Sequence, residues 1–385
     1  MPRLLHYSDV ENVYDDADRA GRLAGCLRTL DAEDAVVCGT GDNTAPGVLA
    51  LVERGRQALD FFAAAGADAD TFGNHDFDFG PDETRALVAD APAGQTWVSA
   101  NVRDEDGDPF GAEAGVVPWT RVETSDGTVG LFGLTDPATH SLNPHAAALS
   151  FTDPVAAAER AVDALADCDH VVCLSHLGIG DDRIAALDVD VVLGGHVHAR
   201  RADVVDGTLC TRPGANGRVV YEVVLDGDGP RAVRHDPSDY PPYEPLAESL
   251  RGRVAAAGLG ETVARVDDPI PRDEATVHAG ECRIGNFVAD AYRTHLDADV
   301  GLANTGGIRS GPPLVDEVTV ADCISVVPFE EPVVLAEVTG AKLLDAFRQG
   351  AGSVVDFGEP DWWHGHFSGA EIRWDDGANE LLDAR

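Results

Sequence analysis

Lysine is nearly absent from this 385-residue chain: Lys342 is the only one, and every other fixed side-chain cation is an arginine. Against 28 lysines and arginines stand 68 aspartates and glutamates, so the formal net charge is −40. A surface of that sign repels the phosphate backbone of nucleic acids and anionic membranes. The composition therefore argues against nucleic acid and membrane as partners.

The same imbalance would destabilise the fold through self-repulsion in dilute buffer. In about 1 M salt the Debye length falls to about 3 Å, which screens most of that repulsion. We therefore expect a cell interior rich in salt, and the composition resembles that of proteins from salt-adapted organisms.

Long apolar runs and paired cysteines are missing as well. No stretch reaches the ~20 apolar residues that cross a bilayer, and the start of the chain lacks the regions of a signal peptide. The seven cysteines never form Cys-x-x-Cys, so neither a disulfide framework nor a zinc knuckle is indicated. We expect a soluble, cytoplasmic protein, and the length suggests two domains at about 100–200 residues each.

Short apolar runs alternate with alanine-rich helical patterns over the first part of the chain, which predicts an α/β fold. The expected helices are Ala17–Leu30, Ala45–Ala65, Asp82–Ala89 and Val155–Ala166. The expected strands are Leu4–Tyr7, Ala35–Cys38, Ala69–Phe72, Trp97–Ala100, Val129–Leu134, His170–Leu174 and Val189–Leu193, with closing strands within Cys210–Leu225. A segment rich in proline and glycine then indicates a linker. We divide the chain into residues 1–230, a linker and bridging helix over 231–262, and a second α/β unit over 263–385.

Metal-ligand residue types follow five of these strands. Catalytic residues of α/β folds gather on loops past strand ends, and imidazole and carboxylate ligands suit Mn, Fe, Zn or Co. Two ions about 3.5–4 Å apart can clamp the attacking and leaving oxygens of a phosphoryl transfer, with one bridging carboxylate expected. The residues are Asp9 and Glu11; Asp42; Asn74, His75 and Asp78; His176; and His196 and His198.

In this order the motifs resemble calcineurin-like metallophosphoesterases. The run Asn74–Gly80 is similar to the form in 5′-nucleotidases, UDP-sugar hydrolases and 2′,3′-cyclic phosphodiesterases. The resemblance continues with Ile284-Gly285-Asn286-Phe287, Asn304-Thr305-Gly306-Gly307-Ile308-Arg309, Pro328-Phe329 and Ser368-Gly369. It implies a four-layer α/β/β/α metallophosphoesterase domain followed by a smaller α/β substrate-binding domain.

The resemblance also implies roles around two divalent ions, which could be Mn, Co, Zn or Mg. Asp42 would bridge them, Asp9 and His198 would complete one site, and Asn74, His176 and His196 the other. His75 would be the catalytic histidine, oriented by Asp78, because a neighbouring carboxylate raises an imidazole pKa and sets its tautomer. Glu11 stands where the family usually has histidine; we favour it as an oxygen ligand over a solvent-facing residue.

The second domain would choose the substrate. Arg309 would contact an anionic or polar part of it, and Phe329 would stack on a base, although core packing is the plainer interpretation of a phenylalanine. Asn304 and Gly307 would shape the pocket, and Arg283 is a weaker phosphate-contact candidate. The family's domain usually continues into a segment with a second stacking aromatic, whereas this chain stops at Arg385.

Three functions stay open at this point. The first is hydrolysis of nucleotide phosphate monoesters, which Arg309 and Phe329 favour. The second keeps the metal centre for a cyclic phosphodiester, a UDP-sugar or a sulfur-linked substrate. The third is a degenerate nucleotide-binding protein without turnover, against which the pair His75 and Asp78 argues. The oligomeric state and the metal identity are not indicated.

Overall fold

The computed structural model describes residues 1–385 other than 32–34, 228, 331, 355–360, 376–377 and 379. It divides into two compact units, Met1–Ala257 and Gly258–Arg385. The segment 231–262, expected as a linker and bridging helix, supplies strand β14 (Arg231–His235) and helix α8 (Glu244–Ala256) to the first unit.

Two six-stranded sheets form the centre of the first unit. In the first sheet the order is β14, β13 (Val220–Val224), β1 (Arg3–Tyr7), β2 (Val36–Gly39), β3 (Ala69–Asp70) and β4 (Thr96–Trp97). In the second it is β11 (Arg201–Val205), β12 (Thr208–Arg212), β10 (Val191–Gly194), β9 (His170–His176), β7 (Gly127–Thr135) and β6 (Trp119–Thr124). A separate pair joins β5 (Val102–Arg103) and β8 (Ser150–Phe151).

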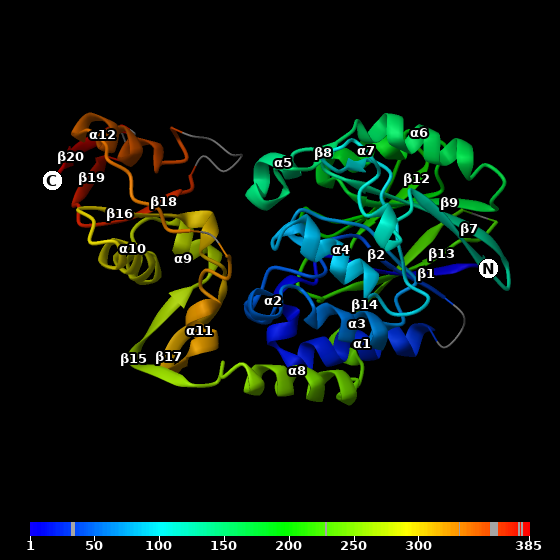
Figure 1. Ribbon diagram of the computed structural model, residues 1–385, viewed down its shortest axis with the longest axis horizontal. Coiled ribbons are helices and arrows are strands. Elements are labelled where there is room, and N and C mark those ends of the chain that lie inside the picture. Colours follow the sequence, from blue (N-terminus) through cyan, green and yellow to red (C-terminus); the bar gives the residue numbers. More distant parts are fainter. Residues whose placement is uncertain (32–34, 228, 331, 355–360, 376–377, 379) are drawn as a thin grey trace. The chain divides into compact units, whose positions relative to one another are not determined.

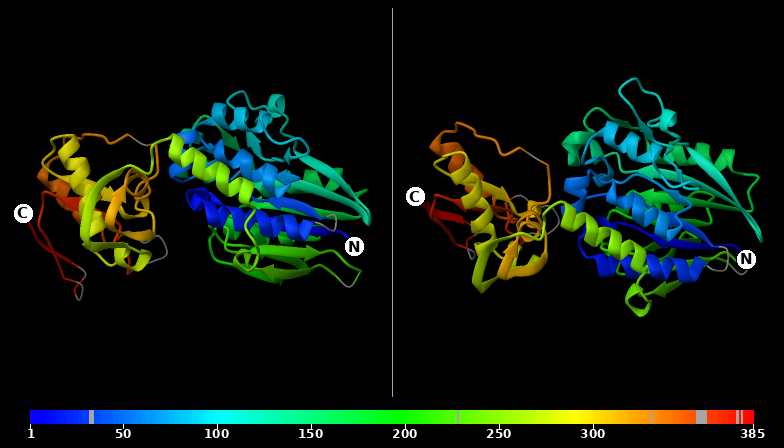
Figure 2. Two further views of the ribbon diagram at one scale, coloured as in Figure 1. Left: turned by 90° about the horizontal axis from the view of Figure 1, so that it is seen from below. Right: turned by 60° about the horizontal axis from the view of Figure 1, so that its bottom comes forward.

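The two sheets pack face to face, because Leu4 and Val36 of the first share one buried cluster with Leu131 and Val172 of the second. Helices α1 (Ala17–Asp31), α3 (Gln57–Ala65) and α8 lie together on the outer side of the first sheet (Figures 1 and 2). Helices α6 (Pro154–Ala164) and α7 (Asp181–Ala185) cover the second. This arrangement confirms the four-layer α/β/β/α architecture.

One expected helix is wrong. The pattern predicted a continuous helix over Ala45–Ala65, whereas the structure has α2 (Val48–Glu53) and α3 as separate helices. Arg54 and Gly55 between them have left-handed backbone angles (φ 52° and 80°), which no helix interior accommodates. The remaining helices of this unit are α4 (Pro81–Ala89) and α5 (Thr139–Leu142).

The buried strands were predicted well and the edge strands were missed. Strands β1, β2, β7, β9 and β10 fall where the apolar runs place them, but β3 and β4 are two residues each. Strands β6, β11 and β14 lie at sheet edges and expose many of their side chains, so they lack the apolar run of a buried strand.

The second unit is a smaller α/β assembly around its own apolar cluster, which includes Ile284, Val288 and Leu314. Its strand pairs are β15 (Thr262–Arg272) with β17 (Gly311–Thr319), β16 (Gly301–Asn304) with β18 (Gly365–Ser368), and β19 (Ile372–Asp375) with β20 (Glu380–Ala384). Its helices are α9 (Glu274–His278), α10 (Arg283–His295), α11 (Val320–Ile324) and α12 (Gly340–Gln349).

Candidate metal centre

Parallel pairing brings the expected ligand loops to one edge of the first unit. Strand β2 runs parallel to β1 and β3, and β9 runs parallel to β10, so the loops after them emerge on the same side of each sheet. Six of the seven expected ligands form two groups whose ligand atoms lie within 4.8 Å of one another. The groups are Asp42, His176 and His196, and Asp9, Glu11 and His198.

Asp42 and His176 of the first group are buried, and His176 has a defined tautomer. His176 Nδ1 lies 2.7 Å from the backbone oxygen of Thr40, which can only accept, so Nδ1 carries a proton and Nε2 turns toward the metal-ligand group. There Nε2 lies 3.1 Å from Asp42 Oδ2. Burial lowers the pKa of His176, but the Asp42 carboxylate outweighs burial and raises it to about 10.

Glu11 belongs to the second group and lies inside the protein, 4% exposed. His198 Nε2 is 3.0 Å from Glu11 Oε1 and 3.8 Å from Asp9 Oδ1. Burial, reinforced by the Asp42 and Glu11 carboxylates, raises the pKa of Asp9 to about 7. Glu11 thus points its carboxylate at the other members of the group, as an oxygen ligand would.

Backbone hydrogen bonds join the two groups. The backbone N–H of His196 donates to Asp9 Oδ1 at 3.1 Å, and the N–H of Glu11 donates to the carbonyl of Asp42 at 3.2 Å. These two hydrogen bonds link the groups directly. The linkage fits a dinuclear centre better than two independent sites.

Four of the candidate ligands have left-handed backbone conformations. The φ angles are 47° at Asp9, 49° at Glu11, 53° at Asp42 and 71° at His196. Such conformations cost about 1–3 kcal/mol each and are concentrated at functional sites. The strain lies on the residues that form the two groups, which supports a role beyond packing.

Asn74, the seventh expected ligand, supplies the clearest test of fit to a metal. Its side-chain oxygen is buried and has no hydrogen-bond partner among the described residues. Leaving a buried acceptor unsatisfied costs about 1–3 kcal/mol, whereas a carbonyl oxygen is an ordinary ligand for divalent ions. The next residue, His75, donates its backbone N–H to Asp42 Oδ1 at 2.7 Å. The donor set of carboxylates, imidazoles and one amide therefore fits divalent metal ions.

His75 and Asp78 form the expected pair on the 3-10 helix η2 (His75–Phe77). His75 Nδ1 lies 2.9 Å from Asp78 Oδ2 and 3.1 Å from Oδ1. Burial lowers the pKa of His75, but Asp78 and then Asp42 outweigh it and raise the pKa to about 9. The neighbouring carboxylates therefore favour the protonated imidazole.

Three supporting residues were not predicted. Asp76 accepts from the backbone N–H groups of Asp42 and Gly73 at 2.8 Å each, which shapes the turn of the central ligand. Asp136 Oδ2 lies 3.6 Å from His196 Nε2, and Asn143 donates to Asp78 Oδ1 at 2.8 Å. Asp76 stands within the quoted Asn74–Gly80 motif, but the other two carry no local signal.

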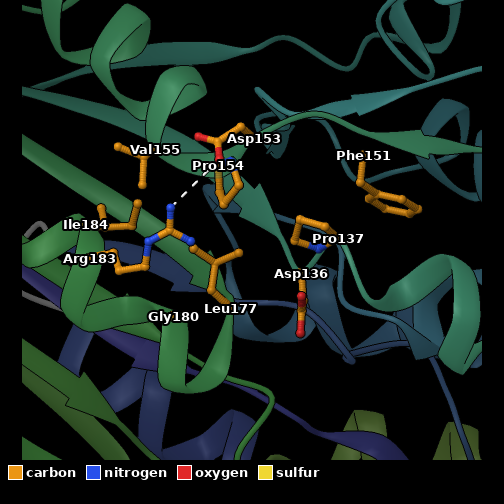
Figure 3. A pocket seen from close by; sticks show the side chains of 10 residues that line it. All are labelled: Asp136, Pro137, Phe151, Asp153, Pro154, Val155, Leu177, Gly180, Arg183 and Ile184. Atoms are coloured by element: carbon orange, nitrogen blue, oxygen red, sulfur yellow. Dashed lines mark ion pairs between the residues drawn. The ribbon is translucent and has the colours of Figure 1, made fainter.

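A cavity of about 360 Å³ lies in the first unit, and none of the candidate metal ligands lines it. Asp136 and Leu177, the neighbour of His176, lie in its wall, which is otherwise largely apolar (Figure 3). Arg183 faces Asp153 across it at 3.8 Å. The cavity therefore combines apolar walls with one cation.

In the second unit the structure brings Arg309 and Phe329 together. The guanidinium carbon of Arg309 lies 5.5 Å from the centre of the half-buried Phe329 ring, within cation–π range. Gly307 packs closely on Asn304, since a Cβ there would meet Asn304 Oδ1 at 2.9 Å. Arg283 donates to the backbone oxygens of residues 268 and 269, so its guanidinium supports the fold.

Residues 262–380 match the family model described as 5′-nucleotidase, C-terminal domain. The chain is 25% identical over 410 residues to the trifunctional nucleotide phosphoesterase protein YfkN of Bacillus subtilis (strain 168). That alignment covers 92% of this chain and 28% of YfkN. The chain is 24% identical over 423 residues to a 5′-nucleotidase of Homo sapiens, which covers 90% of this chain and 71% of that protein. The chain spans 28%, 64% and 58% of the first three curated relatives.

Among solved structures, the 5′-nucleotidase precursor from Thermus thermophilus superposes with a TM-score of 0.78 at 22% identity, covering 99% of this chain and 84% of that one. The chain therefore shares the two-unit α/β fold of that protein, and its second unit carries the matched C-terminal domain. The second unit matches the 5′-nucleotidase C-terminal domain, and the chain is similar along most of its length to nucleotide phosphoesterases and 5′-nucleotidases. No helix in the described part of the chain is both long and apolar enough for a bilayer crossing.

Proposed function

We propose that the protein hydrolyses phosphate esters of nucleotides with two divalent metal ions. The observation that carries the proposal is the pair of adjacent ligand groups, Asp42–His176–His196 and Asp9–Glu11–His198, four of whose members have left-handed backbone angles. Asn74 would add the buried amide oxygen to the first group. The family match of the second unit and the names of the relatives support nucleotides as the substrate class.

When bound, the ions would polarise the phosphoryl group and lower the pKa of a water molecule. The chain's own residues account for the rest. His75 is hydrogen-bonded through Nδ1 to Asp78, and in its protonated form it can stabilise negative charge on the reacting phosphoryl oxygens or give its Nε2 proton to the leaving oxygen. Arg309 and Phe329 present a cation and an aromatic face in one place, as needed for a nucleotide's anionic and base parts.

The experiment is a substrate panel of AMP, 2′,3′-cyclic AMP, UDP-glucose and bis-p-nitrophenyl phosphate in molar KCl, with Mn, Co, Mg and Zn in turn. We expect hydrolysis of AMP that requires a divalent metal and stops after exhaustive chelation. Activity unaffected by chelation would refute the two-metal proposal. Preference for the cyclic or sugar ester would keep the centre and change the substrate, and binding without turnover would favour a degenerate protein.

A further inference from the structure

Asn143 lies between helix α5 and the 3-10 helix η4 (Pro144–Ala146) and is 5% exposed. Its amide oxygen accepts from the backbone N–H of His145 at 2.9 Å. A backbone N–H can only donate, so this bond fixes which end of the amide is oxygen. The NH₂ group must therefore face the opposite side.

On that side the NH₂ group meets two acceptors of the metal centre. It donates to Asp78 Oδ1 at 2.8 Å and to the backbone oxygen of Asn74 at 2.7 Å. Both hydrogens and the oxygen of the amide are thus used, and the side chain has one orientation. Asp78 cannot rotate away from His75 without losing this partly buried hydrogen bond.

We infer that Asn143 is a positioning residue that ties the His75–Asp78 pair and the candidate ligand Asn74 to the α5–η4 loop. The inference rests on the proposed function for its kinetic consequence. One neutral donor orders the Asp78 carboxylate without neutralising its charge, so Asp78 keeps its attraction for the His75 proton. The same side chain fixes the backbone that carries Asn74, so the proton donor and the amide ligand keep their spacing.

The test compares Asn143→Ala and the isosteric Asn143→Asp with Asn101→Ala. Asn101 is the matched control, because it is fully buried and bonds the backbone N–H and carbonyl oxygen of Thr135 at 2.9 and 2.8 Å but touches neither His75 nor Asp78. Supporting residues of metal sites commonly contribute about 10- to 100-fold to activity or metal affinity. We expect both Asn143 variants to lose about 10- to 100-fold in kcat for AMP with KM nearly unchanged. Asn143→Asp should be at least as impaired as Asn143→Ala, since a carboxylate cannot donate. Asn101→Ala should lose thermal stability while its folded fraction keeps kcat.

A second readout needs neither metal nor turnover. In the metal-free protein, the His75 Nδ1 proton should give a slowly exchanging downfield NMR signal, identified by its loss in His75→Ala. The signal should vanish or broaden in both Asn143 variants and persist in Asn101→Ala. Unchanged kcat and an unchanged signal in folded Asn143→Ala would overturn the inference. So would a kcat loss no larger than that of Asn101→Ala. If the wild type hydrolyses no ester, the proposed function fails, and the NMR signal alone then decides the role of Asn143.

Discussion

Arg212 and Asp181 form a buried ion pair behind the metal centre, and removing one partner should be costly. Arg212 Nη2 lies 2.7 Å from Asp181 Oδ2 and also donates to the backbone oxygen of Gly178 at 2.7 Å. Ser175 donates to the other Asp181 oxygen at 2.6 Å. The two residues are 6% and 1% exposed, and their partners bracket the candidate ligand His176.

The change to make is Arg212→Met, which keeps the length and apolar volume of the side chain and deletes the charge. It leaves the Asp181 carboxylate buried without a counter-charge, which costs about 3–5 kcal/mol. The double variant Arg212→Met/Asp181→Asn retains an acceptor for Ser175 and buries no charge. It should therefore recover most of the lost free energy of unfolding.

The cost should depend on pH. Burial already raises the pKa of Asp181, and losing Arg212 should raise it further. Because the folded-state pKa lies above the unfolded value, protonation favours folding at low pH. This contribution is lost as the pH rises through the folded-state pKa. The deficit of Arg212→Met relative to wild type should thus shrink toward acid pH, while the double variant shows no such trend.

The assay is urea unfolding in molar KCl, followed by tryptophan fluorescence, at several pH values. Arg121→Met, which removes an exposed pair with Asp167, is the control and should change little. A deficit below about 1 kcal/mol for Arg212→Met would contradict the assignment of a buried, compensated charge. So would a double variant as unstable as the single one.

Three further outcomes are expected. His75→Ala should cut kcat by roughly 10²- to 10⁴-fold without losing the bound metal, which is measured by mass spectrometry. Asp42→Ala should lose the metal. If His75→Ala lost the metal and Asp42→Ala kept it, the two roles would be wrong. The melting temperature, measured by calorimetry, should rise from dilute to molar KCl. The reason is that the Debye length falls from about 10 Å at 0.1 M to about 3 Å, which screens the repulsion within a net charge of −40. A melting temperature that does not change with salt would contradict this. Phe329→Ala should raise KM for AMP by about 5- to 150-fold, which corresponds to about 1–3 kcal/mol of base stacking. The KM for p-nitrophenyl phosphate should hardly change. An equal loss of activity on both substrates would identify Phe329 as a core residue.

The candidate ligands could be predicted because each one follows an apolar strand within a few residues. Asp42 after β2 and His176 at the end of β9 are local signals. Parallel pairing of the strands then brings the loops that follow them to the same side of each sheet. Asn143 gives no such signal, because its partners Asn74 and Asp78 lie 69 and 65 positions away. An asparagine before a proline indicates a turn or a cap, and Asn143 is also the cap of η4.

In the fold, too, features that depend on local sequence patterns could be predicted, and features that depend on distant contacts could not. The four layers follow from alternating strands and helices, which are local patterns. The break at Arg54 is different, since arginine is a good helix former and nothing in its neighbourhood except Gly55 indicates a left-handed turn. The adjoining Gly55 packs against Leu87 and Thr44, contacts that exist only in the folded chain.

The left-handed ligand residues place stability and chemistry in opposition. At Asp9, Glu11, Asp42 and His196 a glycine would adopt the native backbone angles without strain, and at the first three it would also remove a buried ionisable side chain. In a metal-free laboratory selection for thermal tolerance, the favoured replacements would fall on these positions and dismantle the centre while leaving the sheets intact. Random drift toward valine, isoleucine or threonine is blocked there, because β-branched side chains do not tolerate these angles. Any stabilisation campaign on this scaffold therefore has to hold these four residues constant or be run with metal present, so that binding free energy opposes the relief of strain.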